Sequence, residues 1–242
     1  MKQRGRKAFE VFAGSGHLSK AFRADGWETL EHDLIHGMNV LHPEYEQRCD
    51  ALLDEADALH RGTECTTMSR ANRFPYRDKL NPFGFDSLKG DRLVRCQQGT
   101  AMAQMSWRLH CRMIQRGKSS SIENPWTSDL WNLPPFADEV KAALAGTLSP
   151  ALGVQMYVVK THYCMWCRSR AQKRTAILTN NRSSLSLNNK CIHKGHKVVL
   201  QGKKKFRGIG WASLTKVLGN KYPLAMCSRW VRSVDESLLL DP

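Results

Sequence analysis

The sequence predicts an α/β fold built on a doubly wound, mostly parallel sheet, and three observations support this prediction. An apolar strand, a glycine turn, a helical stretch and a second strand ending in acids follow one another over residues 8–33. Strand-like and helical segments then alternate along the chain, which is typical of parallel strands joined by helical crossovers. The 242 residues, 41% of them hydrophobic, are enough for one substantial core.

The expected elements follow from apolar periodicity and from turn-forming residues. Residues 8–12 and 27–34 are expected to be strands, joined through a turn with Gly14 and Gly16 and a helix that starts near Leu18. Further helices are expected at residues 44–59, 100–116, 136–145 and 223–234, further strands at 119–123, 154–160 and 175–179, and a long loop at 72–92. Residues 181–210 are polar and basic, with little periodicity.

The net positive charge of the chain comes from its second part. Residues 1–139 hold 19 basic and 19 acidic side chains, whereas residues 140–234 hold 18 basic and no acidic ones, and the net charge is +15. Ordinary surfaces mix both signs, so this segregation predicts a face for a polyanion, DNA or RNA. The alternative is a basic surface that serves only solubility.

Cysteine usage and the apolar pattern bear on location. No apolar run is long enough to span a bilayer, and the basic residues 1–7 are followed by a polar, glycine-rich stretch rather than a signal-peptide core. Eight cysteines in a chain of this class predict reduced thiols or metal ligands. We therefore expect no membrane partner and a reducing compartment, the nucleus or the cytoplasm.

The glycine turn is a candidate cofactor site. Gly14 and Gly16 lie between a strand and a helix, where a ligand can approach the backbone and free N–H groups. Asp33 ends the next strand, where a carboxylate can bind ribose hydroxyls. The third glycine of the pyrophosphate-binding pattern is missing, so a nucleoside cofactor without a pyrophosphate is favoured over a dinucleotide. A tight turn without a ligand is the alternative.

Five short blocks carry a family resemblance. They are Phe12-Ala-Gly-Ser-Gly-His-Leu18, Gly62-Thr-Glu-Cys-Thr-Thr-Met-Ser-Arg-Ala-Asn-Arg73, Ile122-Glu-Asn-Pro125, Ala171-Gln-Lys-Arg174 and Leu218-Gly-Asn220. In this order the set resembles the motifs of the cytosine-5 DNA methyltransferases. The resemblance implies a Rossmann-like, class I methyltransferase fold and the cofactor S-adenosylmethionine. It implies cofactor contacts from Phe12, Ala13, Gly14, Ser15, Gly16, His17, Leu18, Asp33 and Asn220.

The same resemblance implies a catalytic set of Cys65, Glu123 and Arg174. A thiolate that adds to carbon 6 of cytosine makes carbon 5 nucleophilic, and Cys65 stands in the position of that thiolate. Glu123 would hold the N3 edge of the ring, and Arg174 would position the base or the adduct. In a duplex the base must first be flipped out. The alternatives are that Cys65 is a small buried hydrophobe and that Glu123 is a solvated carboxylate.

Some residues depart from the family pattern. Thr63 and Glu64 precede the cysteine where the family usually has two prolines, and a carboxylate there is expected to raise the thiol pKa. Ala176 stands where the second of two paired arginines is expected. The segment between residues 174 and 219 is short for a target-recognition domain.

These observations suggest three segments. Residues 1–180 would form the cofactor-binding catalytic domain, residues 181–217 a short basic insertion, and residues 218–242 a return to the catalytic domain. Contacts to nucleic acid are expected from Ser69, Arg70, Arg73, Lys203, Lys204, Lys205 and Arg207.

Cysteine and histidine spacing adds a candidate zinc site to the insertion. Cys164 and Cys167 form a C-x2-C pair, and Cys191 and His196 could complete a tetrahedral site, with His193 as the competing fourth ligand. A metal would stabilise a segment poor in apolar residues. The alternative is that the first two cysteines simply pack in the core.

The leading hypothesis is a DNA cytosine-5 methyltransferase with a covalent Cys65 adduct. An RNA cytosine-5 methyltransferase on the same fold is the second, since the charge pattern does not separate the two. The third is a catalytically inactive nucleic-acid-binding domain, which Glu64 beside the thiol favours.

Overall fold

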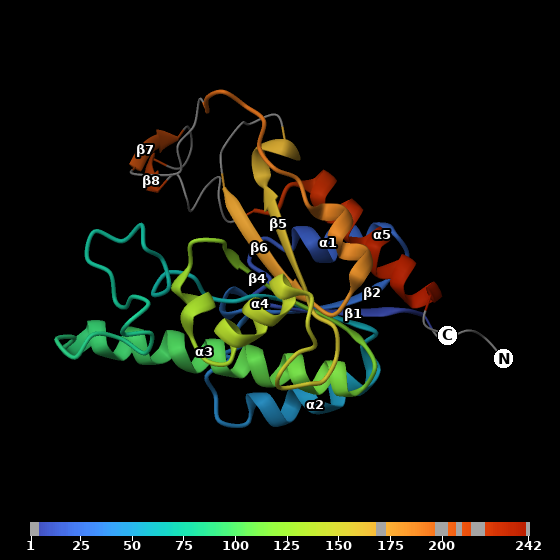
Figure 1. Cartoon of the computed structure of the whole chain (residues 1–242), viewed down its shortest axis with the longest axis horizontal. Helices are drawn as coiled ribbons and strands as arrows, with labels where there is room; N and C mark the ends of the chain where they lie inside the picture. Colours follow the sequence, from blue (N-terminus) through green and yellow to red (C-terminus); the bar gives the residue numbers. More distant parts are fainter. Residues whose placement is uncertain (1–4, 168–172, 197–202, 207–209, 214–220, 241–242) are drawn as a thin grey trace.

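The computed structural model describes residues 5–167, 173–196, 203–206, 210–213 and 221–240. Its centre is a six-stranded sheet with the order β2-β1-β3-β4-β6-β5. Figure 1 shows the helices packed on both faces of this sheet. The strands are β1 (Lys7–Val11), β2 (Glu28–His32), β3 (Ala58–Gly62), β4 (Ser119–Pro125), β5 (Tyr157–His162) and β6 (Arg174–Thr179).

The sheet is mostly parallel, as the sequence predicts. β1 pairs in parallel with β2 and β3, and β3 pairs in parallel with β4. β6 is antiparallel to both β4 and β5, so β5 runs in the direction of β4. Because β1 lies inside the sheet and the chain extends from it to both sides, the predicted doubly wound arrangement is confirmed.

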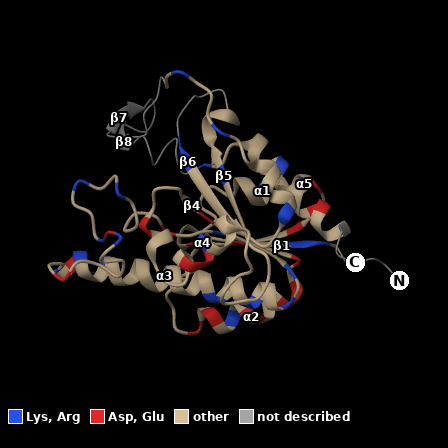
Figure 2. Ribbon diagram, in the orientation of Figure 1, with Lys and Arg blue, Asp and Glu red and all other residues tan. Residues whose placement is uncertain are grey.

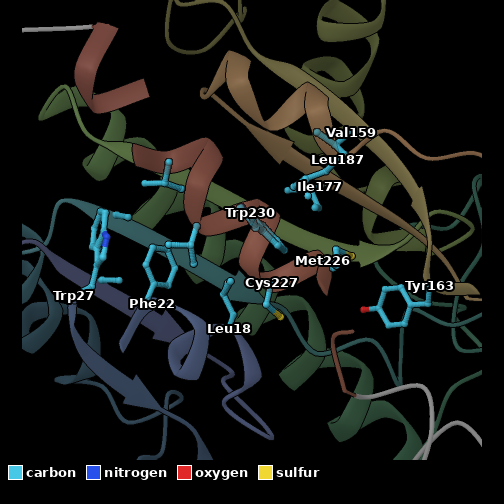
Figure 3. Packing of buried hydrophobic residues seen from close by; sticks show 14 residues of the cluster. Leu18, Phe22, Trp27, Val159, Tyr163, Ile177, Leu187, Met226, Cys227 and Trp230 are labelled. Atoms are coloured by element: carbon cyan, nitrogen blue, oxygen red, sulfur yellow. The ribbon is translucent and has the colours of Figure 1, made fainter. Parts of the chain in front are cut away.

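Two helical layers cover the sheet. α1 (His17–Ala24) and α5 (Leu224–Leu240) lie against one face, and α2 (Tyr45–Glu55), α3 (Gly90–Gln115) and α4 (Phe136–Ala145) lie against the other. Figure 3 shows the first layer, whose buried side chains include Phe22 of α1, Trp230 of α5 and Ile177 of β6. The strand neighbours Ala176 and Leu178 point to the opposite layer, so β6 has no hydrophilic face.

Most expected elements are present, with two differences. The expected helix 44–59 ends at Glu55, and residues 58–62 form the central strand β3, which the sequence did not predict. The helix expected at 100–116 begins at Gly90. The expected helix 136–145 has those bounds, and residues 63–89 contain the expected long loop.

The segment predicted as a basic insertion begins on the main body. The short helix η4 (Arg182–Leu187) packs against α5, where the Asn181 amide donates to the Ser233 carbonyl oxygen at 3.0 Å. Further on, β7 (Lys203–Phe206) and β8 (Gly210–Ser213) pair as an antiparallel hairpin. Among the helices that the structure describes, none combines the length and the apolar character needed to cross a bilayer.

A buried carboxylate joins β1 to α1. Glu10 is 3% exposed, and it accepts hydrogen bonds from the backbone N–H and the hydroxyl of Ser19, at 2.9 and 2.5 Å. Burial raises the pKa of Glu10 to about 7. This contact fixes the first turn of α1 over the sheet and so fixes the glycine turn that precedes it.

Candidate active site

The carboxyl ends of the parallel strands meet at one edge of the sheet, and the predicted site residues lie there. The glycine turn follows β1, Asp33 follows β2, Cys65 follows β3, and Glu123 lies at the end of β4. β6 is antiparallel and therefore begins at this edge, just after Lys173. In doubly wound sheets this edge is the usual ligand site.

A single cavity of about 670 Å³ opens at this edge. It is large enough for a nucleoside cofactor together with part of a base. Its wall includes Gly14, Asp33, Cys65 and Glu123, so the structure brings these four predicted cofactor and catalytic residues together. Apolar side chains from the segment after β2 complete the wall; they are Leu34, Met38, Val40 and Leu41.

The glycine turn has a strained backbone. Phe12 lines the cavity and has φ of 60°, a left-handed conformation that costs a residue with a side chain about 1–3 kcal/mol. Gly14 and Gly16 are left-handed too, with φ of 54° and 59°. The Asp33 carboxylate accepts the Gly14 N–H at 2.9 Å and thereby ties the turn to the end of β2.

Some residues of the predicted cofactor motif line the cavity, and others do not. Phe12, Ala13, Gly14 and Ser15 line the cavity with Asp33. Gly16, His17 and Leu18 do not line it: Leu18 is buried in the core beneath α1, and the His17 ring contacts the Tyr222 carbonyl oxygen at 2.8 Å. Asn220 lies outside the described residues.

The cysteine loop is shaped by Glu64. The Glu64 carboxylate accepts the backbone N–H of Thr66, and it accepts the Thr67 hydroxyl at 3.1 Å. It thus caps the turn that carries Cys65, and the thiol lies half-buried in the cavity wall rather than in the apolar core.

Glu123 is buried and surrounded by donors, so it is not the solvated carboxylate of the alternative interpretation. It is 5% exposed and accepts hydrogen bonds from the Thr175 hydroxyl and, at 3.2 Å, from the Tyr222 hydroxyl. The Lys173 ammonium lies 3.4 Å from Glu123 Oε1. Tyr222 in turn contacts His60 Nε2 at 3.0 Å, so the carboxylate is anchored to β3 as well.

Lys173 occupies the position expected for Arg174. The Arg174 side chain is exposed and does not line the cavity, because alternate residues at the start of β6 point in opposite directions. The Lys173 side chain lines the cavity, and its ammonium also donates to the Tyr163 hydroxyl at 3.3 Å. The cation near Cys65 and Glu123 is therefore a lysine.

The Cys65 thiol is predominantly protonated at neutral pH. Burial raises its pKa to about 11; Lys173 acts in the opposite direction, and the carboxylates of Glu123 and Glu64 raise it further. The expected effect of Glu64 therefore has the right sign, although its carboxylate faces the turn.

Lys173 and Tyr222 are among the cavity residues that sequence reasoning missed. Tyr222 precedes α5, and its hydroxyl reaches Glu123 of β4 and His60 of β3. Gly62 makes room for it, since a methyl group on Gly62 would lie 2.8 Å from the Tyr222 hydroxyl. The only signal for Tyr222 in the sequence is that it lies two residues after the Gly-Asn block.

The residues expected to contact nucleic acid are only partly described. Arg70 is exposed and paired with Asp129 at 2.7 Å, and Arg73 is exposed over the Phe74 ring. Ser69 is half-buried in the same loop. Lys203, Lys204 and Lys205 lie in β7 with only their backbone described, and Arg207 lies outside the described residues.

Beyond β5, four metal-binding side chains converge into what we term the Cys/His cluster. Its members are Cys164, Cys191, His193 and His196. Their candidate ligand atoms all lie within 4.8 Å of one another. Cys167, expected as a ligand, is not a member; its thiol donates to the Tyr163 carbonyl oxygen at 3.3 Å, and His193 joins the cluster instead.

No family model matches the sequence, and no curated protein is significantly similar to it. The chain resembles the solved structure of the methyltransferase EhMeth of Entamoeba histolytica, with a TM-score of 0.40 and 10% identity over 81% of this chain and 58% of that chain. It also resembles a DNMT2 mutant of Spodoptera frugiperda, with a TM-score of 0.35 and 11% identity over 81% of this chain and 54% of that chain. This chain spans little more than half the length of either.

Proposed function

We propose that this protein transfers a methyl group from S-adenosylmethionine to carbon 5 of cytosine in DNA, through a covalent adduct with Cys65. The observation that carries the proposal is the single cavity whose wall contains the glycine turn, Asp33, Cys65 and Glu123. Those four features meet only because the strand ends lie at one edge of the sheet.

The residues of the turn fit a nucleoside cofactor. The left-handed Gly14 brings bare backbone to the cavity, and Phe12 and the apolar wall offer surfaces for an adenine. Asp33 lies where ribose hydroxyls would be bound. S-adenosylmethionine, when bound here, supplies an electrophilic methyl group.

Cys65 and Glu123 have different roles toward the cytosine base. The Cys65 sulfur, once deprotonated, forms a bond to carbon 6 of cytosine, and the electron pair displaced from the ring double bond makes carbon 5 nucleophilic. Glu123 holds the N3 edge and stabilises the proton there as the sulfur adds. When carbon 5 has gained its methyl group, loss of its proton restores the ring and breaks the carbon–sulfur bond.

Lys173 helps to position Glu123 and supplies positive charge to the cavity. Its ammonium lies between the Glu123 carboxylate and the Tyr163 hydroxyl, and its charge favours the thiolate of Cys65. We infer that Lys173 takes the role expected of Arg174, while the exposed Arg174 is free to contact phosphate.

A polyanion fits the surface beside the cavity. Within residues 140–196 the described part of the chain carries no acid, and the charged positions that Figure 2 marks on β5 and β6 themselves are basic. The exposed cations on β5, on β6 and in the segment that follows are Lys160, Arg174, Arg182, Lys190 and Lys194; Arg182 lies past the end of β6 that is away from the cavity. Their arrangement suits a phosphate backbone and does not distinguish DNA from RNA.

The test is transfer of a labelled methyl group from S-adenosylmethionine to duplex DNA and to RNA, with the wild type, Cys65→Ala and Cys111→Ala. Cys111 is a half-buried thiol of α3 that does not line the cavity, so its variant is the matched control. We expect label on DNA cytosine with the wild type and Cys111→Ala, and none with Cys65→Ala.

Each other outcome contradicts a stated part of the proposal. Transfer that survives Cys65→Ala rules out the covalent mechanism, and label on RNA alone replaces the substrate. If S-adenosylmethionine does not bind at all, the protein is instead a nucleic-acid-binding domain, the function favoured by the high pKa of the Cys65 thiol.

A further inference from the structure

We propose that the Cys/His cluster binds one structural zinc ion, with two thiolates and two imidazoles as its ligands. This site does not depend on the proposed methyl transfer. Its ligands are Cys164, which follows β5, and Cys191, His193 and His196, which lie within six residues of one another.

The spacing of the ligand atoms suits tetrahedral zinc. With Zn–S and Zn–N bonds of about 2.3 and 2.0 Å, neighbouring ligand atoms of a tetrahedron lie about 3.3–3.8 Å apart. Cys191 Sγ lies 3.4 Å from His193 Nδ1 and 3.1 Å from His196 Nε2. All four ligand atoms fall within 4.8 Å of one another, so small side-chain rotations would complete the site.

The burial pattern of residues 191–196 is the reverse of what hydrophobicity alone predicts. Ile192 is 81% exposed, whereas Cys191, His193 and His196 are half-buried. An isoleucine is normally the most buried residue of such a segment. Because the metal-binding side chains turn inward and the apolar one turns outward, a bound ion explains the orientation of the segment and hydrophobic packing does not.

The segment before the ligands is already docked on the sheet. β5 is an edge strand, and its Lys160 and His162 exchange backbone hydrogen bonds with Asn189. The Cys191 N–H donates to His162 Nδ1 at 3.0 Å. The sheet thus delivers three ligands next to Cys164 without the metal, which lowers the entropic cost of assembling the site.

The charge of the site also suits zinc rather than a harder cation. The four ligands are sulfur and nitrogen donors, with no carboxylate between residues 140 and 234 to attract calcium or magnesium. Two thiolates neutralise a divalent ion, so the complex adds no net charge to a region that is already cationic. The ion would anchor the chain where the basic segment after His196 begins.

The experiment is elemental analysis of the full chain purified without a histidine tag, for the wild type, Cys191→Ser, His193→Ala and Cys167→Ser. We expect one zinc per chain in the wild type and in Cys167→Ser, and loss of most of the zinc in the other two. Cys167 is the matched control, since it is a nearby thiol outside the cluster.

A second measurement covers variants that fail to fold. Exchange of the wild-type metal for Co²⁺ should give intense visible d–d bands and a near-ultraviolet thiolate-to-cobalt band, as expected of a tetrahedral site with two sulfur ligands. Zinc-free wild type, or a Cys164–Cys191 disulfide in freshly purified protein, overturns the proposal. Zinc that is lost in Cys167→Ser but retained in His193→Ala overturns the ligand set.

Discussion

The side-chain amide of Asn124 donates a 2.7 Å hydrogen bond to the backbone carbonyl oxygen of Thr63. The bond joins the end of β4, which carries Glu123, to the loop that carries Cys65 two residues later. Asn124 is fully buried, and its Oδ1 makes no hydrogen bond within the described part of the chain. Together with the pairing of Gly62 and Glu123 in the sheet, this contact holds the carboxylate and the thiol at a fixed spacing.

Asn124→Ala should reduce methyl transfer as well as stability. The change leaves a buried carbonyl without its donor, which costs about 1–3 kcal/mol in the free energy of unfolding. Misplacement of the thiol should lower kcat about 100-fold. Urea denaturation and single-turnover kinetics measure the two effects.

Asn180→Ala is the control for this prediction. Its amide donates to the Lys118 carbonyl oxygen at 3.0 Å, away from the cavity, so it should lose comparable stability and keep kcat. Equal kcat in the two variants would show that the Asn124 bond serves stability alone.

The effect of neighbouring charges on the pKa of the Cys65 thiol can be measured through its rate of alkylation. With a pKa of about 11, Cys65 is about one-thousandth thiolate at pH 8. Glu64→Gln removes a charge that raises this pKa while keeping an acceptor for the turn, so iodoacetamide should react several-fold faster. Lys173→Met should slow it several-fold. Mass spectrometry follows the reaction, with the exposed Lys160→Met as the control; the opposite order of rates would contradict the assigned charges.

The first strand–turn–helix unit was predictable because its signals are local. Glycines at positions 14 and 16 adopt left-handed backbone, and they lie between the mostly buried strand β1 and helix α1. β3 was not predictable in the same way, because its residues His60 and Arg61 are polar yet buried. The Nη2 group of Arg61 contacts His110 and Ser120, which are distant in sequence, so tertiary contacts override the local pattern.

The same distinction separates the site residues. Cys65 and Glu123 were found from short blocks that resemble a family, and both line the cavity. Lys173 and Tyr222 were missed because their roles depend on side-chain direction and on the packing of α5. A sequence block places a segment at the sheet edge, but the phase of β6 decides which of two adjacent cations faces inward.

Asp33→Asn should weaken binding of S-adenosylmethionine by about 10- to 100-fold. The amide oxygen can still accept the Gly14 N–H, so the turn is kept, while the charged acceptor for ribose hydroxyls is lost, at about 1.5–3 kcal/mol. Isothermal titration calorimetry measures the affinity. Asp57→Asn is the matched control, because Asp57 accepts the Lys7 N–H at 2.8 Å, at the amino end of β1 rather than at the site edge. Unchanged affinity in Asp33→Asn would remove Asp33 from the cofactor site.

Glu10 should make the protein less stable as pH rises from about 4.5 to 7. Its folded-state pKa is raised to about 7 from 4.5, so in this window the unfolded chain has released the proton that the folded chain retains. The free energy of unfolding then falls by about 1.4 kcal/mol per pH unit from this group, about 3 kcal/mol in all, and the contribution is constant above pH 7. Below about pH 4.5 the stabilising contribution is fully present.

Glu10→Gln removes the titrating group and keeps an acceptor for Ser19, so its stability should lack this slope. Urea denaturation of both proteins between pH 4.5 and 8 gives the difference in the free energy of unfolding, which should shift in favour of the variant by about 3 kcal/mol across that range. Glu28→Gln, on the exposed side of β2, should follow the wild type. A constant difference between wild type and Glu10→Gln would mean that Glu10 is ionised throughout, with its charge stabilised by the hydroxyl and the N–H of Ser19 at the start of α1.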